Sequence, residues 1–486
     1  MATLPTIDEL LAKISVLERA NAAQAETIGV QAAELEELRA KVAELQRLIG
    51  RHSANSSVPP SRDTSAQRKA QAEARRERRG AERKPGKQPG AEGKNLAQVT
   101  DPDEVIELRP DRCCDCGGDL ASGEDLDEDE VRQVFDIPKP EMIVTEYRAR
   151  KVRCRCGTTN VATFPAEARA PASYGPRVRA IGLYLMARQH IPFERAAEAL
   201  RDLFGVEVST GFLDFCYSEG AERLDGFVEA LRLMLKDEPV VHFDETSDRL
   251  GTATMWFHVA CTDMLTLLHA DETRGHDAVV RHGVLPGYTG IAVHDRLSQY
   301  QSYTSAAHAF CCAHLVRDLT SVSTIPGQAG WSTKMIDLLY EMHAATEAAR
   351  DAGRTKLSKK VLDGYLARYD DLVAWAFRVN PEQLRPKPTK LQRESFNLAT
   401  AFRTHRTEIT RFASDLRVAF SNNEAERDLR HAKIHRKVSG CFHSMQGAKR
   451  LANVRSYLTT ARKHDLGAFE VLTRLFQGDP WIPQVT

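Results

Sequence analysis

The sequence has no excess of charge of either sign and no long apolar run. Lys and Arg together number 67, and Asp and Glu also number 67, so net charge alone indicates no class of partner. No apolar run approaches the ~18 residues that a membrane span needs. The chain also starts without the basic and then apolar pattern of a signal peptide. We therefore expect a cytoplasmic protein that is not bound to a membrane.

The composition is that of a globular protein. Of the 486 residues, 42% are apolar and 28% are charged, which is enough apolar material for a sizeable core and excludes general disorder. The length allows about two to four domains. Ten cysteines in a cytosolic chain favour metal ligands or free thiols over a disulfide framework.

The first segment carries a heptad repeat. Ten of thirteen seam positions over residues 7–49, spaced alternately three and four apart, are apolar. A seam this narrow is typical of a coiled coil, and a buried Asn such as Asn21 favours two strands. We expect a parallel homodimer through residues 7–49. The alternative is a helix docked on the protein's own core, which would need a wider apolar face.

A basic segment follows the heptads. Residues 52–65 have a loop composition, and residues 68–94 carry ten Lys or Arg against four acids. Pro and Gly interrupt any helix in residues 83–90. A flexible cationic arm suits the phosphate backbone of a nucleic acid, while a solvated linker is the alternative.

Four cysteines have the spacing of zinc ligands: Cys113, Cys116, Cys154 and Cys156. Each pair is followed by glycine, which lets the backbone turn so that its amides face the thiolates. We predict one structural zinc ion held by these four, with a strand at residues 141–152 between the pairs. Cys114 could compete as a ligand. Chance free thiols and a redox pair are the alternatives, the second disfavoured because no βαβ pattern surrounds the cysteines.

A helical module follows the cysteines. Residues 177–190 and 193–204 are helical by pattern, and another helix begins after Gly205 with Ser209 and Thr210 as its cap. This is the outline of a helix-turn-helix that contacts DNA, although an ordinary helical hairpin has the same pattern.

The apolar period changes after Pro239. We predict buried strands at residues 240–244, 254–261, 265–270 and 291–295, with a helix at 275–284 before the fourth strand. Three strands, a helix and a strand are the order of an RNase H-like fold, in which the first and fourth strands are neighbours.

Two of these strands are expected to end in acids, Asp244 and Asp295. Carboxylates side by side stay ionised readily only when cations lie between them. That arrangement is a Mg²⁺ site for phosphodiester chemistry, with two ions about 4 Å apart. The alternative is that strand-end acids form turns or cap helices. Asp271 begins the same Asp-Glu-Thr sequence as Asp244 but is expected to lie in a loop.

A third acid is expected after a long helical region at about residues 335–412. Ser421 fits an N-cap and Glu424 a capping box with it, which leaves Glu426 as the ligand. A solvated helix of mixed charge is the alternative. Positive charge near a bound strand is expected from Lys433, His435, Arg436 and Lys437.

Cys311 and His314 form a C-x2-H motif between these acids. A second metal site would need two further ligands. We therefore favour a packed cysteine and a hydrogen-bonded histidine, and keep metal binding as the alternative.

Together these motifs resemble the insertion sequence 66 family of DDE transposases over nearly the whole chain. The resemblance rests on residues 55–61, 84–90, the paired cysteines, 244–246 with Trp256, 294–295, Cys311 with His314, and 422–427. It implies an RNase H-like fold with a helical insertion before the glutamate, and a catalytic triad of Asp244, Asp295 and Glu426. Ser421 replaces a usual acid and Val58 a usual Lys, and neither change removes a proposed metal ligand.

The resemblance implies a transposase that cuts at transposon ends and joins the 3′-OH to target DNA by two-metal phosphoryl transfer, using Mg²⁺ or Mn²⁺. The expected partner is double-stranded DNA, both ends and target, and the expected location is the nucleoid in the cytoplasm. A catalytically inactive DNA-binding regulator derived from a transposase is the main alternative. A zinc-dependent RNA-binding protein is another.

We therefore predict a multidomain α+β protein. Its parts are a coiled coil at 1–50, a basic flexible linker at 51–98, a zinc-binding domain at 99–165, a helix-turn-helix-like helical module at 166–236, an RNase H-like catalytic domain at 237–440 with a helical insertion at about 330–415, and a C-terminal helical segment at 441–486.

Overall fold

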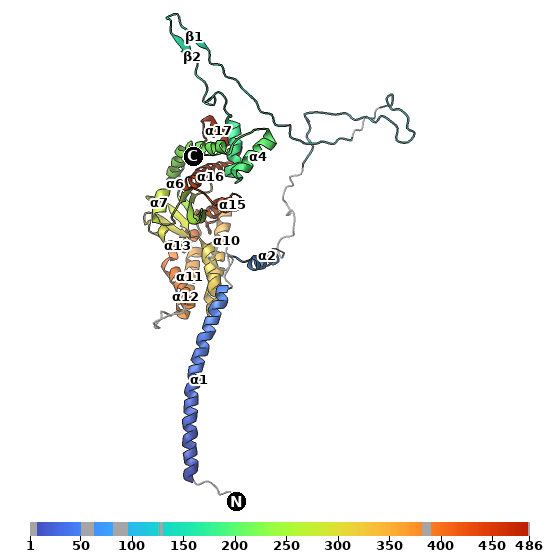
Figure 1. The fold of residues 1–486 in the computed structure, drawn as a ribbon. Coiled ribbons are helices and arrows are strands. Elements are labelled where there is room, and N and C mark those ends of the chain that lie inside the picture. The colour runs from blue at the N-terminus through green and yellow to red at the C-terminus, as the bar shows by residue number, and fades with distance from the viewer. Residues whose placement is uncertain are drawn as a thin grey trace. The chain divides into compact units, whose positions relative to one another are not determined.

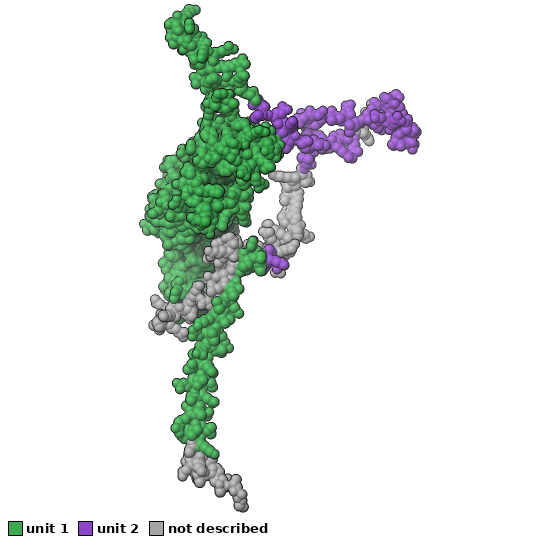
Figure 2. Space-filling view, in the orientation of Figure 1, with its two compact units in different colours: residues 1–68, 144–486 green, residues 69–143 purple. Residues whose placement is uncertain are grey.

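The computed structural model describes residues 7–49, 63–80, 96–124, 126, 130–381 and 390–484. The chain divides into two compact units, residues 1–68 with 144–486 and residues 69–143 (Figure 2). The larger unit contains a five-stranded sheet and most of the helices (Figure 1). Within the described ranges, no helix combines the length and apolarity that crossing a bilayer requires.

The first segment is a single helix, α1 (Ile7–Ile49), as its heptads predicted. The apolar seam side chains that the structure describes, from Ile14 onward, are exposed in the single chain, with 62% of Leu17, 64% of Ile28 and 58% of Leu38 accessible. Whether they form a coiled coil stays a prediction.

Part of the basic segment is helical, which the sequence analysis did not predict. Helix α2 spans Ser65–Gly80. A capping box begins it, because Thr64 Oγ1 accepts the N–H of Gln67 at 3.2 Å and Gln67 Oε1 accepts the N–H of Thr64 at 2.9 Å. Residues 83–90, expected to be without helix, lie outside the described residues.

The helical module forms as predicted, with one irregularity. Helix α3 (Pro176–Leu183) continues into a π-helical turn, η2 (Tyr184–Arg188), rather than running as one α-helix to His190. Helix α4 (Phe193–Phe204) has the predicted bounds and ends at Gly205 in the left-handed region. Helix α5 (Thr210–Glu222) begins at Ser209, whose Oγ accepts the N–H of Phe212. Helix α6 (Asp225–Asp237) then leads to the sheet.

The sheet contains β3 (Val240–Leu250), β4 (Ala253–Cys261), β5 (Thr266–Asp271), β6 (Ile291–His294) and β7 (Ala307–Phe310), in the order β5-β4-β3-β6-β7. Strands β3, β4 and β5 are antiparallel, whereas β3–β6 and β6–β7 are parallel. The predicted neighbourhood of the first and fourth strands is therefore confirmed. Helix α7 (His276–His282) precedes β6, and α8 (Ser298–Gln301) follows it.

Strand β3 is longer than predicted. We expected it to end at Asp244, but it continues to Leu250 because β4 pairs with it as far as Leu250 opposite Ala253. Asp244 thus lies inside a strand rather than at its end.

The two faces of β6 belong to different cores. Val293 packs with the helices of the insertion, and Ala292 faces the core that includes α6 and the C-terminal helices. The insertion helices, yellow to orange in Figure 1, are α9 (Cys312–Ser323), α10 (Ala329–Asp351), α11 (Lys359–Val379), α12 (Lys390–Thr404) and α13 (Arg406–Ser414).

The C-terminal helices cover the edge of the sheet. Helix α16 (Met445–Lys463) lies along β5, where Ser456 Oγ accepts the N–H of Leu268 at 2.8 Å and Thr460 Oγ1 accepts that of Thr266 at 3.1 Å. These bonds satisfy edge groups that would otherwise be open to another strand. Helix α17 (Ala468–Gln477) follows α16.

Candidate active site

The structure brings Asp244 of β3 near Asp295, the residue directly after the neighbouring strand β6. In the parallel pairing of β3 and β6, His242 lies opposite Val293. Asp244 and Asp295 each lie two residues beyond this last pair of the register, and the charge of Asp295 acts on Asp244. Asp295 directly follows β6, and its Oδ1 accepts the N–H of Leu297 at 2.9 Å, an Asx turn that fixes the carboxylate.

Glu426 is the third predicted acid, and it lies on α14 (Asn423–Asp428). The pKa of Asp244 is well above its usual range, first because the group is buried and then because Glu245, Asp295 and Glu426 repel its charge. The three predicted acids therefore share one electrostatic neighbourhood, although 182 residues separate the first from the last.

The start of α14 differs from the prediction. Asn422, not Ser421, is the N-cap. Glu424 forms an ion pair with Arg427 at 3.0 Å, one turn along the helix, so it does not complete a capping box. The predicted caps are therefore wrong.

Asn422 was missed as a site residue, and it joins α14 to the sheet. Its side chain is 1% exposed. Its Nδ2 donates to the carbonyl of Phe243 at 2.8 Å, its Oδ1 lies 2.9 Å from Nδ1 of His242, and its backbone N–H donates to Sγ of Cys311 at 3.2 Å. The one sequence signal for this role was the Asn pair directly before the helix.

Glu245, next to Asp244 on β3, is also held tightly. Tyr300 donates its hydroxyl to Oε2 at 2.6 Å, and Arg274 donates Nε–H to Oε1 at 2.8 Å. Arg274 also lies over the ring of Trp256, 5.1 Å from its centroid. Adjacent strand residues point to opposite faces, so Glu245 braces the strand from the face opposite Asp244. No local signal marked this role.

Asp271 is not the loop residue that we predicted. It is the last residue of β5 and is 5% exposed. Arg281 donates to both of its oxygens, at 2.7 and 2.8 Å, and Thr273 donates its N–H at 2.9 Å. Burial opposes ionisation, but the hydrogen bonds outweigh it and hold the pKa of Asp271 below its usual range. Asp271 therefore anchors α7 to the sheet.

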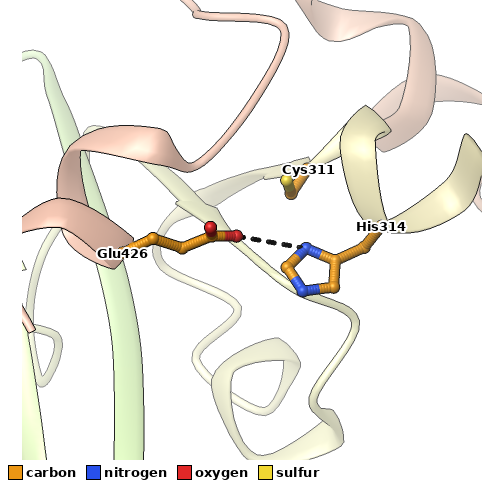
Figure 3. A group of neighbouring side chains, drawn as sticks. All are labelled: Cys311, His314 and Glu426. Carbon is orange, nitrogen blue, oxygen red and sulfur yellow. Dashed lines mark ion pairs between the residues drawn. The ribbon is translucent and has the colours of Figure 1, made fainter. Parts of the chain in front are cut away.

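Cys311 and His314 lie beside Glu426 (Figure 3). One ligand atom from each of the three residues lies within 4.8 Å of the other two. Nδ1 of His314 is 3.9 Å from Oε1 of Glu426 and has no hydrogen-bond partner among the described residues. The buried Cys311 agrees with the preferred interpretation, whereas Nδ1 of His314 lacks the hydrogen bond that this interpretation expected. Arg317 approaches the same carboxylate oxygen at 3.6 Å.

Four residues after α14 were expected to carry positive charge, and three of them do. Helix α15 (Arg430–Val438) exposes Lys433, Arg436 and Lys437. His435 instead stacks on Phe442 with ring centroids 4.2 Å apart, and burial lowers its pKa to about 4. His435 is therefore neutral at pH 7 and adds no charge to this surface.

The first cysteine pair forms a tight turn in the smaller unit. The N–H of Cys113 donates to Gly118 at 2.8 Å, and Gly117 adopts a φ of 70°. Backbone N–H groups of Cys116 and Asp115 lower the pKa of Cys113, so the turn favours a thiolate.

The second pair forms a similar turn in the larger unit, at the tip of a hairpin of β1 (Lys151–Arg153) and β2 (Thr159–Val161). Gly157 has a φ of 92°, and hydrogen bonds from Thr158 lower the pKa of Cys156 to about 7. Only the end of the predicted strand at residues 141–152 forms, since β1 begins at Lys151. Because the pairs belong to different units, the joint four-cysteine site stays a proposal.

The chain belongs to the Transposase IS66 family, whose profile matches residues 171–450. The zinc-finger binding domain of transposase IS66 matches residues 110–157, and a family of unknown function matches residues 3–97. The first two matches support a transposase role, DNA binding and a structural zinc ion.

Two relatives from Sinorhizobium fredii are similar over most of their length. The chain is 24% identical over 444 residues to the uncharacterized protein y4hP, an alignment that covers 78% of this chain and 76% of the relative. It is 25% identical over 415 residues to the uncharacterized protein y4qI, with 78% and 73% covered.

Proposed function

We propose that this protein is a DNA transposase that cuts at the ends of its transposon and joins the freed 3′-OH to target DNA by metal-dependent phosphoryl transfer. The observation that carries the proposal is the convergence of Asp244, Asp295 and Glu426 on one electrostatic neighbourhood. The sheet order β5-β4-β3-β6-β7, with Asp244 on β3 and Asp295 directly after the adjacent strand β6, supports an RNase H-like catalytic domain.

The donor set fits divalent cations. Asp244, Asp295 and Glu426 supply carboxylate oxygens, which Mg²⁺ and Mn²⁺ prefer. Burial is the main cause of the raised pKa of Asp244, and repulsion from Glu245, Asp295 and Glu426 adds to it, a repulsion that bound cations would relieve. When bound, two ions would activate the attacking oxygen and stabilise the charge that develops at the phosphate.

The surrounding residues hold the three acids in place. Asn422 fixes the start of α14 against β3, which positions Glu426 relative to Asp244. Glu245 is clamped by Tyr300 and Arg274 and limits movement of β3 at Asp244. The Asx turn at Asp295 orients its carboxylate. This preorganisation lets the acids act without rearrangement during the reaction.

Other parts of the chain would bind the DNA. We assign phosphate contacts to the exposed basic residues of α15, to α2 and the basic segment after it, and to the zinc-binding region. Contact by the α4–α5 pair is the helix-turn-helix part of the proposal. Pairing of α1 with a second copy would bring two transposon ends together.

The direct test is single-turnover cleavage of duplex DNA that carries the inverted repeats flanking the gene. We expect Mg²⁺-dependent cutting at the repeat end and transfer of the 3′ end to a second duplex. Specific binding of the repeats without cutting, in Mg²⁺ and in Mn²⁺, would instead identify a DNA-binding regulator. Preference for RNA over duplex DNA would contradict both.

A further inference from the structure

We propose that Cys311, His314 and Glu426 form a site for a thiophilic divalent ion such as Zn²⁺, distinct from the cysteine pairs at residues 113–116 and 154–156. The ion would take Glu426 away from the carboxylate site and so inhibit the enzyme. Metal binding stands on the geometry alone, whereas the inhibition rests on the proposed function.

The three side chains come from two distant segments that meet at the active site. Cys311 is the single residue between β7 and α9, His314 lies in the first turn of α9, and Glu426 lies on α14. Their ligand atoms lie within 4.8 Å of one another, and Figure 3 shows the carboxylate and the imidazole facing each other with the thiol beside them. In the part of the chain that the structure describes, no other group of three such side chains meets this spacing.

The surroundings of Cys311 suit a metal thiolate. Cys311 is the N-cap of α9, and its Sγ accepts the backbone N–H of Asn422 at 3.2 Å. Burial raises the pKa of Cys311 to about 11, while the N–H groups of Asn422, His314 and Ala313 act in the opposite direction. A divalent ion that binds the thiol releases the thiol proton to solvent, and the resulting thiolate already has a hydrogen bond from the N–H of Asn422.

The ligand set selects the class of ion. A thiolate, an imidazole and a carboxylate match Zn²⁺ and Co²⁺, while Mg²⁺ takes oxygen ligands. Three protein ligands leave a fourth position for water. Arg317, 3.6 Å from the Glu426 oxygen, would have to turn away when the ion binds.

Occupation of this site has a consequence for the carboxylates. Glu426 also belongs to the proposed Mg²⁺ set with Asp244 and Asp295. A carboxylate oxygen held beside Cys311 is lost to that set, so Zn²⁺ and Mg²⁺ compete for one residue. The expected behaviour is inhibition by Zn²⁺ that excess Mg²⁺ reduces.

Co²⁺ is the probe, because a thiolate bound to Co²⁺ gives a charge-transfer absorption. We expect full-length protein, already loaded with its structural zinc, to gain this absorption up to one equivalent of Co²⁺. Cys311→Ser should lose it, and His314→Asn should weaken Co²⁺ binding at least tenfold. Equal spectra and affinities in the wild type and in folded His314→Asn would overturn the proposal, whatever the folding of Cys311→Ser.

Two matched controls are available. Cys312→Ser changes the neighbouring buried thiol, which lies outside the group. His405→Asn removes a histidine that also lies 3.9 Å from a glutamate, Glu408, at a similar exposure, but it lies in no such ligand group among the described residues. Both should bind Co²⁺ like the wild type, and a loss in either equal to that in His314→Asn would contradict the site.

The inhibition is measured separately, as Zn²⁺ titrated against Mg²⁺-dependent cleavage. His314→Asn should require at least tenfold more Zn²⁺ for half-inhibition, relative to its own uninhibited rate. Equal sensitivity would refute the competition. A wild type that binds Co²⁺ through Cys311 yet never cleaves DNA would refute the proposed function and leave the metal site standing.

Discussion

Oδ1 of Asn422 lies 2.9 Å from Nδ1 of His242, two residues before Asp244 on β3. This contact spans 180 positions of the chain and connects the helix of the third acid to the strand of the first. Burial lowers the pKa of His242, which favours the neutral ring, and Nδ1 is the donor because the amide oxygen of Asn422 can only accept. Neutral hydrogen bonds from the Asn422 side chain therefore connect β3 to α14, and among the described residues no ion pair joins these two elements.

Replacing Asn422 tests this connection. Asn422→Ala should lower the free energy of unfolding by about 2–3 kcal/mol, because it leaves buried groups of His242 and Phe243 without partners. Cleavage by the folded fraction should also fall, since α14 loses its anchor. Urea unfolding and single-turnover rates measure the two effects. Asn423→Ala, at the exposed neighbouring position, should change neither, and equal effects of both substitutions would contradict the role of Asn422.

The triad gives the sharpest prediction for catalysis. Asp244→Asn, Asp295→Asn and Glu426→Gln each preserve shape and remove charge, so each should abolish cleavage while DNA affinity stays near wild type. Combining them should add no further loss, because one missing ligand already disables the unit.

Glu424→Gln is the control for the triad, because Glu424 pairs with Arg427 on the helix surface and should be dispensable. An active Glu426→Gln together with an inactive Glu424→Gln would show that the third ligand is misassigned by two residues. Normal cleavage by all four variants would end the two-metal proposal.

Asp271 should affect stability and its dependence on pH. Its pKa is lowered in the folded state, so its ion pair with Arg281 stabilises the fold above the unfolded pKa of about 3.9 and is lost as pH falls through the folded value. Asp271→Asn should therefore cost about 1–2 kcal/mol at pH 7, and the difference from wild type should shrink below pH 4. Urea unfolding at both pH values measures this, and a constant difference would contradict it.

The seam of α1 predicts the oligomeric state. Deleting residues 1–50 should give a monomer whose remaining domains stay folded, because the described apolar seam side chains of α1, from Ile14 onward, are exposed in the single chain. Asn21→Leu should raise the stability of the helix pair and relax its preference for two strands. Sedimentation velocity distinguishes these outcomes, and an unchanged sedimentation of the truncated protein would show that α1 does not determine the dimer.

The cysteine pairs predict one structural zinc ion per chain, apart from any ion at Cys311. Cys113→Ser or Cys154→Ser should release it and loosen residues 100–165, since structural zinc contributes directly to folding. Cys114→Ser should retain it. Metal analysis with hydrogen exchange measures both, and an equal loss of zinc in the Cys114 variant would rule out the proposed ligand set.

Features that depend on neighbouring residues were predictable from the sequence. The heptads of α1, the bounds of α4, the cap at Ser209 and the glycine turns after each cysteine pair all follow from spacings within a few residues. Side chains return to the same face every 3.6 residues in a helix and every 2 residues in a strand. Local backbone geometry sets these periods, so they can be read from the order of apolar residues. The pairing of β3 with β6 was also predicted, because three strands, a helix and a strand are the order of an RNase H-like fold, in which the first and fourth strands are neighbours.

The tertiary structure alone decided which distant side chains meet. The sequence predicted a loop at Asp271, but a contact with Arg281 of α7 holds this residue at the end of β5. The sequence predicted Ser421 as the helix cap, but Asn422 takes that position and binds the carbonyl of Phe243 in β3. Cys311 and His314 lacked further ligands in sequence, and α14 supplies one from 112 positions beyond His314. Such contacts depend on how buried polar groups satisfy one another across packed elements, and no local spacing encodes that.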